Sequence, residues 1–283
     1  MMKHHSFAVG DNLALTIESV AFGGMGVGRV GGMVVFVPYT AEGDQVDIRI
    51  VRVRRNYLEA ELQRILVPSP HRTDPLCRHY GVCGGCHYQH ITYDHELFLK
   101  ESQVVDSFER IGKFFHPPVQ SIIASSGMYG YRQKAEFHAL YDHEGACSTG
   151  FMDSDGKTLI PIDRCEILDE SINAEYGRIR DNPDQDGSLP PRMVFWSNLP
   201  FGASGEITRT VKGREILVPA RGFFQANACL VDKLVEFVTQ ACSESPEGAL
   251  LDCCCGSGLF ALFAAREGQP VITAENGDVA GAA

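Results

Sequence analysis

The sequence contains little tryptophan and no long uninterrupted apolar run. Tryptophan occurs once in 283 residues, and the N-terminal MMKHHSFAVG has no apolar core of signal-peptide length. The most apolar late stretch, ALLDCCCGSGLFALFAA, is interrupted by Asp252 and two glycines, which excludes a membrane span there. We therefore expect a cytoplasmic protein without a membrane partner, and we expect it to be a monomer.

Positive charge is also scarce. The chain has 25 Lys and Arg residues against 36 Asp and Glu residues, a net charge of -11 and a pI near 5.4. This balance excludes a protein that coats nucleic acid over its whole surface, although a local basic groove is compatible with an acidic body. Disulfides are not expected in a cytoplasmic chain, so the ten cysteines should be buried thiols, reactive thiols or metal ligands.

Short strands separated by turns dominate residues 10–66. The segments LALTIESVAF, MVVFVPYT, QVDIRIVRV and YLEAELQRIL follow one another without helical periodicity. So many strands in one short region predict a small closed barrel of the oligonucleotide-binding type. The segment GGMGVGRVGG could be a phosphate-binding loop, but such a loop should open a helix and here another strand follows. We interpret it as a β-turn or bulge.

Basic residues gather near the end of one predicted strand. The segment RIVRVRRN holds four arginines, namely Arg49, Arg52, Arg54 and Arg55. We predict that they form a phosphate-contacting edge on an RNA-binding barrel, and that Arg132 and Lys134 provide a second RNA contact. The alternative is a solvated strand face with no ligand.

The pattern changes along the rest of the chain. Residues 94–112 have apolar positions at helical spacing and end at Gly112, whereas residues 129–220 are β-rich. Residues 227–244 form a predicted amphipathic helix, and residues 249–274 have the order strand, glycine loop, helix, strand. That last order marks the start of a doubly wound domain, so the fold class is multi-domain α/β.

Three cysteines lie close together in CRHYGVCGGCHYQH at C-x5-C-x2-C spacing. Soft thiolates at this spacing suit an iron–sulfur cluster or zinc, and either centre normally takes four ligands. A nearby histidine could complete a zinc site. Cys165 in IPIDRCEIL is the better fourth ligand and Cys147 is its rival, while the other cysteines fit helix or strand packing. Unliganded thiols are the remaining alternative.

These motifs carry a resemblance to a known family. CRHYGVCGGCHYQH followed by LFLKESQVV resembles the iron–sulfur segment of TRAM-domain RNA (uracil-5-)-methyltransferases of the 23S rRNA type. GGMGVGRVGGMVVFVPYT, YRQKAEFHA, DRCEIL, FFQAN and LLDCCCGSGLFAL continue the likeness in order. The resemblance implies S-adenosyl-L-methionine as cofactor, ribosomal or transfer RNA as partner, and a [4Fe-4S] cluster. The implied cluster ligands are Cys77, Cys83, Cys86 and Cys165.

The resemblance also implies how the chain is organised. It predicts an OB-like TRAM barrel, a β-rich central domain with the iron–sulfur segment, and the start of a Rossmann-like methyltransferase domain. The expected boundaries are 1–66 for the barrel, 67–92 for the iron–sulfur segment, 93–116 for a helix packing on the methyltransferase domain, 117–220 for the central domain and 221–283 for a truncated cofactor-binding domain.

The glycine loop is the predicted cofactor site. Gly256 and Gly258 would let the backbone approach a ligand at a helix N-terminus, and Glu275 is placed to accept ribose hydroxyls. The resemblance adds Gln225, Cys254 and Leu259 to the cofactor contacts, although the family commonly has an aromatic and a polar residue at the last two positions.

Methylation of uracil carbon 5 needs a cysteine thiolate that adds to carbon 6 and a base that removes the carbon-5 proton. In the family both groups lie well downstream of the glycine loop, and no segment here resembles them. We therefore assign no catalytic residue and expect an incomplete enzyme that is inactive as given. The alternatives are a non-catalytic RNA-binding iron–sulfur protein and a zinc-stapled binding module.

Overall fold

The computed structural model describes residues 7–182, 188–244 and 248–275. The chain divides into two compact units. The first unit is Met1–Ala124 together with Asp153–Lys157, and the second is Ser125–Met152 together with Thr158–Ala283.

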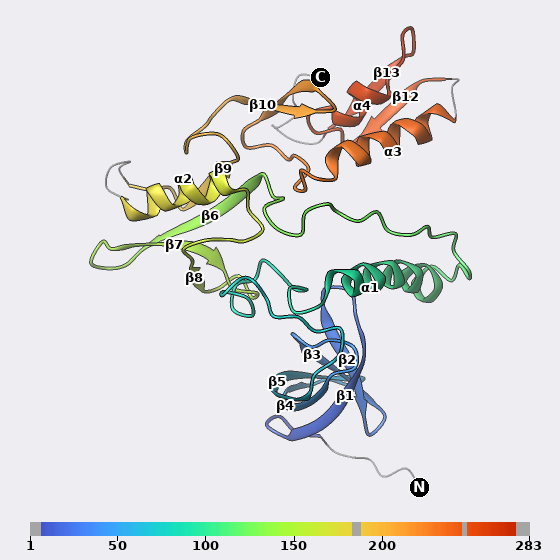
Figure 1. The fold of residues 1–283 in the computed structure, drawn as a ribbon, viewed down its shortest axis with the longest axis vertical. Helices are drawn as coiled ribbons and strands as arrows, with labels where there is room; N and C mark the ends of the chain where they lie inside the picture. The colour runs from blue at the N-terminus through green and yellow to red at the C-terminus, as the bar shows by residue number, and fades with distance from the viewer. Residues whose placement is uncertain (1–6, 183–187, 245–247, 276–283) are drawn as a thin grey trace. The chain divides into compact units, whose positions relative to one another are not determined.

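Five strands of the first unit close into a barrel in the order β1-β2-β3-β5-β4, which confirms the predicted N-terminal barrel (Figure 1). Only β3 and β5 pair in parallel; the other neighbours are antiparallel. Alternate residues point inward, as Ile48 and Ile50 of β4 do, and are almost completely buried. The strands are β1 (Asn12–Val20), β2 (Met25–Val30), β3 (Met33–Pro38), β4 (Gln45–Val53) and β5 (Tyr57–Val67).

Strand β2 runs through the glycine-rich segment, where the sequence indicated only a turn or bulge. Its glycines have a packing reason. A Cβ on Gly26 would lie 1.8 Å from Thr40 Oγ1, and one on Gly28 would lie 2.5 Å from Leu15 Cδ1. Because neighbouring side chains occupy this space, the two buried positions of β2 are glycines, and the strand lacks the inward-facing apolar residues by which a strand is recognised in a sequence.

Helix α1 (Tyr93–Asp106) and the π-helical turn η1 (Ser107–Ile111) follow the barrel, as the helical spacing predicted. Buried Leu99 joins an apolar cluster with Val20 of β1, and Gln103 Nε2 donates to the Val20 carbonyl over 3.0 Å. The helix is therefore anchored to the barrel by both apolar and polar contacts.

The second unit begins with an antiparallel sheet in the order β8-β7-β6-β9. The Phe137 ring of β6 stacks on Tyr176 of α2, with ring centroids 3.9 Å apart. These two rings are at the centre of one core cluster. The elements are β6 (Lys134–Tyr141), β7 (Cys147–Met152), β8 (Leu159–Pro161), α2 (Glu170–Asp181) and β9 (Arg192–Trp196).

A second core cluster joins β10, β11, α3 and the start of α4. β10 and β11 form a hairpin, whereas β12 and β13 pair in parallel with α4 between them in the chain. The strand–helix–strand order is the one that the sequence predicted, and the start of a doubly wound domain stays a prediction. The elements are β10 (Glu206–Val211), β11 (Arg214–Pro219), α3 (Val231–Ser243), β12 (Leu250–Cys253), α4 (Leu259–Ala264) and β13 (Val271–Ala274).

Candidate functional site

The cysteine loop of the first unit is a series of tight turns. The amides of Tyr80 and Cys83 donate to the carbonyls of Cys77 and His79. Cys77, Cys83 and Cys86 are all half-buried. Burial raises the pKa of the Cys83 thiol, the amide of Gly85 opposes that shift, and the nearby charge of Cys77 adds to it. An amide directed at sulfur is the contact that stabilises a thiolate ligand.

Cys165, the predicted fourth ligand, belongs to the second unit. Its backbone is held by Asn173, whose side chain accepts from the Cys165 amide at 3.0 Å and donates to the Cys165 carbonyl at 3.1 Å. Across residues 7–182, 188–244 and 248–275, no three His, Cys, Asp or Glu side chains gather as a metal site requires. The donor chemistry of the loop suits iron and sulfide, but the described side chains do not form the assembled ligand set.

A buried ion pair holds the barrel to the polypeptide that leads into the cysteine loop. Asp44 is fully buried and accepts from the amides of Ala41 and Ser69 at 2.7 and 2.8 Å. Arg72 Nε lies 3.0 Å from both oxygens of Asp44, and Arg72 Nη2 donates to the Tyr39 carbonyl at 2.7 Å. Both oxygens of the Asp44 carboxylate thus accept hydrogen bonds although the side chain is shielded from solvent.

Aromatic and imidazole rings continue this contact into the loop itself. The rings of Tyr39 and Tyr80 meet edge to face with centroids 5.5 Å apart, and Tyr80 Oη shares a hydrogen bond with His90 Nδ1. Burial lowers the pKa of His90 to about 4 and raises that of Tyr80. Both side chains are therefore neutral at pH 7 and serve as packed, hydrogen-bonded supports beneath the cysteines.

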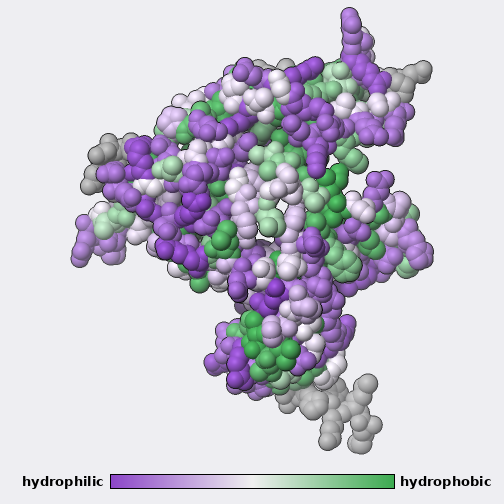
Figure 2. Space-filling view, in the orientation of Figure 1, coloured by the Kyte–Doolittle hydropathy of each residue, from purple (hydrophilic) through white to green (hydrophobic). Residues whose placement is uncertain are grey.

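The four predicted phosphate-binding arginines of the barrel differ in their surroundings. Arg52 and Arg54 both pair with Glu59, at 3.0 and 3.6 Å. Arg49 and Arg55 have no carboxylate within 4 Å among the residues that the structure describes. Two of the four positive charges are thus available without breaking an ion pair. Figure 2 shows apolar residues gathered over part of the barrel surface in the lower part of the view. Exposed Val51 and Val53 alternate with Arg52 and Arg54 at the end of β4 and directly after it.

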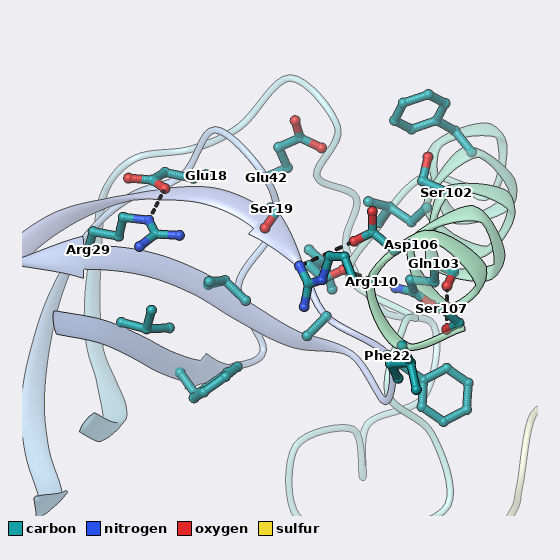
Figure 3. A pocket seen from close by; sticks show the side chains of 18 residues that line it. Glu18, Ser19, Phe22, Arg29, Glu42, Ser102, Gln103, Asp106, Ser107 and Arg110 are labelled. Carbon is teal, nitrogen blue, oxygen red and sulfur yellow. Dashed lines mark hydrogen bonds and ion pairs between the residues drawn. The ribbon is translucent and has the colours of Figure 1, made fainter. Parts of the chain in front are cut away.

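A groove of about 600 Å³ lies between the barrel and α1 (Figure 3). Its two arginines are already paired, Arg29 with Glu18 at 3.3 Å and Arg110 with Asp106 at 3.5 Å. Glu42 adds a third carboxylate to the lining. The groove therefore offers no surplus positive charge, and the basic end of β4 is the more suitable surface for a phosphate backbone.

Arg132 and Lys134 make backbone contacts in the second unit. Arg132 Nε donates to the Lys134 carbonyl at 3.0 Å. The Lys134 ammonium donates to the carbonyl of Gly222 and lies 4.7 Å from the centre of the Trp196 ring. Burial lowers the pKa of Lys134. The sequence had suggested RNA contact for both residues, and nothing in it pointed to Gly222, 88 residues away.

The glycine loop lies at the carboxyl ends of β12 and β13. Gly256 and Gly258 have φ angles of +56° and +74°, and Cys254 between strand and loop has +61°. The left-handed conformation suits glycine and is uncommon for cysteine. Cys254 is exposed, and Leu259 is buried in the same core cluster as Phe224, the neighbour of Gln225.

Glu275 closes the loop from the end of β13. Its Oε2 accepts from the Gly256 amide at 2.6 Å, and the Ala274 carbonyl beside it accepts from the Cys255 amide. The predicted ribose-binding carboxylate is thus held against the predicted backbone site. The contact crosses 19 residues and follows from the parallel register of β12 and β13.

Comparison with known proteins finds a match for the barrel region. The family model described as TRAM domain matches residues 7–63, which contain β1 to β4 and most of β5. In the same unit, the barrel is followed by the cysteine loop and α1.

The curated relatives are RNA methyltransferases by name. An uncharacterized RNA methyltransferase of Synechocystis sp. is 38% identical over 164 residues, which are 58% of this chain and 35% of that protein. Another, from Nostoc sp., is 34% identical over 184 residues, 65% of this chain and 40% of that protein. The chain thus matches about two fifths of the length of these relatives.

One solved structure is similar along most of the chain. It is the Pyrococcus abyssi tRNA (uracil-54, C5)-methyltransferase in complex with S-adenosyl-L-homocysteine. The match covers 93% of this chain and 74% of that one, with a TM-score of 0.65 and 18% sequence identity. At this identity the likeness concerns the fold.

No helix among the described residues is both long and apolar enough to cross a membrane.

Proposed function

We propose that this chain is a member of the S-adenosyl-L-methionine-dependent RNA (uracil-5-)-methyltransferase family, with ribosomal or transfer RNA as its partner. The observation that carries the proposal is the combination within one chain of a TRAM barrel with a strand–loop–helix–strand unit whose glycine loop is closed by a carboxylate. The names of the curated relatives and the fold of the Pyrococcus abyssi tRNA enzyme support the same class.

The cofactor contacts belong to the second unit. We propose that the amides around Gly256 and Gly258 approach the cofactor and that Glu275 exchanges its bond with Gly256 for bonds to the ribose hydroxyls. The other proposed cofactor contacts are Gln225, Cys254 and Leu259.

RNA binding and iron binding are assigned by chemistry. The proposed phosphate contacts on the barrel are Arg49, Arg52, Arg54 and Arg55, and Arg132 is added from the second unit. The thiolates of Cys77, Cys83, Cys86 and Cys165 suit a [4Fe-4S] cluster, which would staple the cysteine loop without taking part in methyl transfer.

The nucleophile is not assigned to any residue of the sequence. The cysteines at 253–255 lie in the cofactor loop and Cys229 precedes α3, so none has the context of a thiolate held beside a base. We propose that the 283-residue chain binds cofactor and RNA without methylating the RNA, because carbon 5 of uracil is not activated until a thiolate adds to carbon 6.

Equilibrium binding tests the cofactor site. The full chain should bind radiolabelled S-adenosyl-L-methionine, and Glu275→Ala should weaken that binding at least about tenfold through loss of charge-assisted hydrogen bonds. Glu267→Ala, at an exposed position after α4, is the matched control and should bind as the wild type does. RNA binding without any cofactor binding would favour a non-catalytic RNA-binding protein instead.

Methyl transfer is tested separately. The full chain is incubated with labelled cofactor and unmodified ribosomal and transfer RNA, and nucleosides are separated by mass. We expect no 5-methyluridine above a control without protein. Its appearance would confirm the uracil-5 class and contradict the proposed inactivity, which would return attention to Cys253, Cys254 and Cys255.

A further inference from the structure

Residues 130–134 connect two segments that carry predicted site residues. On one side, the amides of Gly130 and Arg132 donate to the carbonyls of Glu166 and Ile167, directly after Cys165. On the other side, Arg132 pairs antiparallel with Asn227, directly after the segment of Gln225. All of these residues lie in the second unit, so one short stretch of backbone holds both segments.

The segment around Gln225 is held differently at its two ends. After Gln225, the contacts are backbone hydrogen bonds, from the Ala228 amide to the Tyr131 carbonyl at 2.9 Å and from the Gln133 amide to the Ala226 carbonyl at 3.4 Å. Before Gln225, two side chains take over this role. Trp196 Nε1 donates to the Ala220 carbonyl at 2.8 Å, and the Lys134 ammonium donates to the Gly222 carbonyl.

Lys134 and Trp196 are direct cross-strand partners in the β6–β9 pair. Both side chains contact the backbone directly after β11, and the Lys134 ammonium lies over the indole ring of Trp196. Arg209 is the second cation at this ring, 4.8 Å from its centre, and it donates to the Ser197 carbonyl. A cation on an aromatic face is stabilised by the ring quadrupole, so the cluster tolerates burial of two positive charges.

The Lys134 ammonium has few other ways to be satisfied. None of the described residues places a carboxylate oxygen within 4 Å of it. Burial lowers its pKa, chiefly through lost solvation, and the charge of Glu136 opposes this. The carbonyl of Gly222 is therefore the main polar partner of a half-buried cation, and such a bond is stronger than one between neutral groups.

Gly222 is itself buried and confined. Its amide donates to the Pro219 carbonyl at 2.7 Å, and a Cβ at this position would lie 3.1 Å from the same oxygen. The peptide group is thus fixed by a tight turn on its amide side and by Lys134 on its carbonyl side. Gln225 follows only three residues later.

We propose that Lys134 is a positioning residue: its ammonium fixes the Gly222 carbonyl and thereby sets the place of Gln225 in the cofactor site. This rests on the proposed function, in which Gln225 contacts S-adenosyl-L-methionine. The proposal gives Lys134 a role within the protein in place of the RNA contact that its sequence context suggested.

Three variants of the full chain test this role. Lys134→Met keeps the apolar stem on Trp196 and removes the donor, so cofactor affinity should fall about tenfold through loss of one charge-assisted bond. Lys134→Arg keeps a cationic donor and should recover most of that affinity. Lys233→Met removes the same charge from an exposed position of α3 and should bind cofactor as the wild type does.

Hydrogen exchange gives a readout that does not depend on the cofactor. In Lys134→Met, the amides of residues 222–228 should exchange with solvent at least about tenfold faster. Local opening of this segment no longer has to break the charge-assisted hydrogen bond to the Gly222 carbonyl. The β10–β11 hairpin should keep its rate. If wild-type protein binds no cofactor, the proposed function fails, yet this local exchange still decides whether Lys134 positions the segment.

Salt dependence of RNA binding separates the two roles of Lys134. A phosphate contact would add about 0.7 to the slope of log affinity against log salt for single-stranded RNA. If Lys134 positions the segment, Lys134→Met should leave the salt slope of RNA binding unchanged and should speed up amide hydrogen exchange at residues 222–228. A slope reduced by one contact with unchanged exchange would overturn the proposal and restore the RNA contact.

Discussion

The cysteine loop and the glycine loop are supported in different ways. The cysteine loop adjoins a closed barrel, where a buried carboxylate, an arginine and two tyrosines tie it to strands whose inner residues are fully buried. The glycine loop extends from two four-residue parallel strands, on which Leu251 and Ile272 are 59% and 55% exposed. Parallel sheets are normally covered on both faces, so the second site depends on a much less protected scaffold.

Local stability should show the largest contrast between the two loops. Amides of the barrel should exchange with solvent only through global unfolding, whereas amides of β12 and β13 should exchange by local opening, orders of magnitude faster. Hydrogen exchange with mass readout measures both regions in one sample. Equal protection of β4 and β12 would show that the exposed strands are as stable as the barrel, and the comparison would fail.

Iron content tests whether the cysteine loop holds a cluster. Protein purified without oxygen should contain about four irons per chain, as four-cysteine ligation of a [4Fe-4S] cluster requires. Cys83→Ser and Cys165→Ser should each lose the iron and the brown colour. Cys147→Ser, which changes a half-buried cysteine of β7, is the control and should keep both. Stoichiometric zinc in the wild type would reject the cluster.

Removing the buried ion pair beneath the cysteine loop should destabilise the protein far more than removing the exposed pair between β4 and β5. Asp44→Ala leaves Arg72 buried without its partner, and we expect the free energy of unfolding to fall by about 3–5 kcal/mol. Asp47 pairs with Arg64 at 2.7 Å, but that arginine is 70% exposed. Asp47→Ala should therefore cost less than about 1 kcal/mol in the same denaturant titration.

Protonation of His90 in acid should lower the free energy of unfolding of the first unit. Its pKa is about 4 in the folded protein because of burial, below the ordinary value of 6.5. The unfolded chain therefore binds more protons between these values, so stability is lost as pH falls from about 6.5 towards 4, by on the order of 3 kcal/mol. His90→Asn should remove this part of the pH dependence. His116→Asn, at an exposed position after η1, should leave it intact.

The basic end of β4 should give the smallest measured effect. Each phosphate contact contributes about 0.7 to the salt slope for single-stranded RNA, so replacing Arg52, Arg54 and Arg55 by Ala should reduce the slope by about 2. Arg64→Ala removes a charge from the same barrel and should leave the slope unchanged. If the triple variant keeps the wild-type affinity and slope, the barrel edge does not contact RNA.

Local pattern identified much of this fold. Short segments without helical periodicity, separated by turns, predicted the barrel strands, helical spacing predicted the helix after the cysteine loop, and the order strand, loop, helix, strand predicted the parallel pair. These features depend on the side chains of neighbouring residues, which is the information that a short stretch of sequence contains. Strand β2 was missed because its two buried positions, where neighbouring side chains come close, are glycines, so the strand shows no inward-facing apolar residues there.

The sequence by itself determined the residue types available for chemistry: three closely spaced cysteines, a glycine loop and a run of arginines. Only the tertiary structure decided their partners. It gave Arg52 and Arg54 a shared carboxylate, placed Glu275 on the Gly256 amide, and directed Lys134 to a carbonyl 88 residues away. Such pairings depend on which strands become neighbours and in what register, and that is set by burial of the whole core.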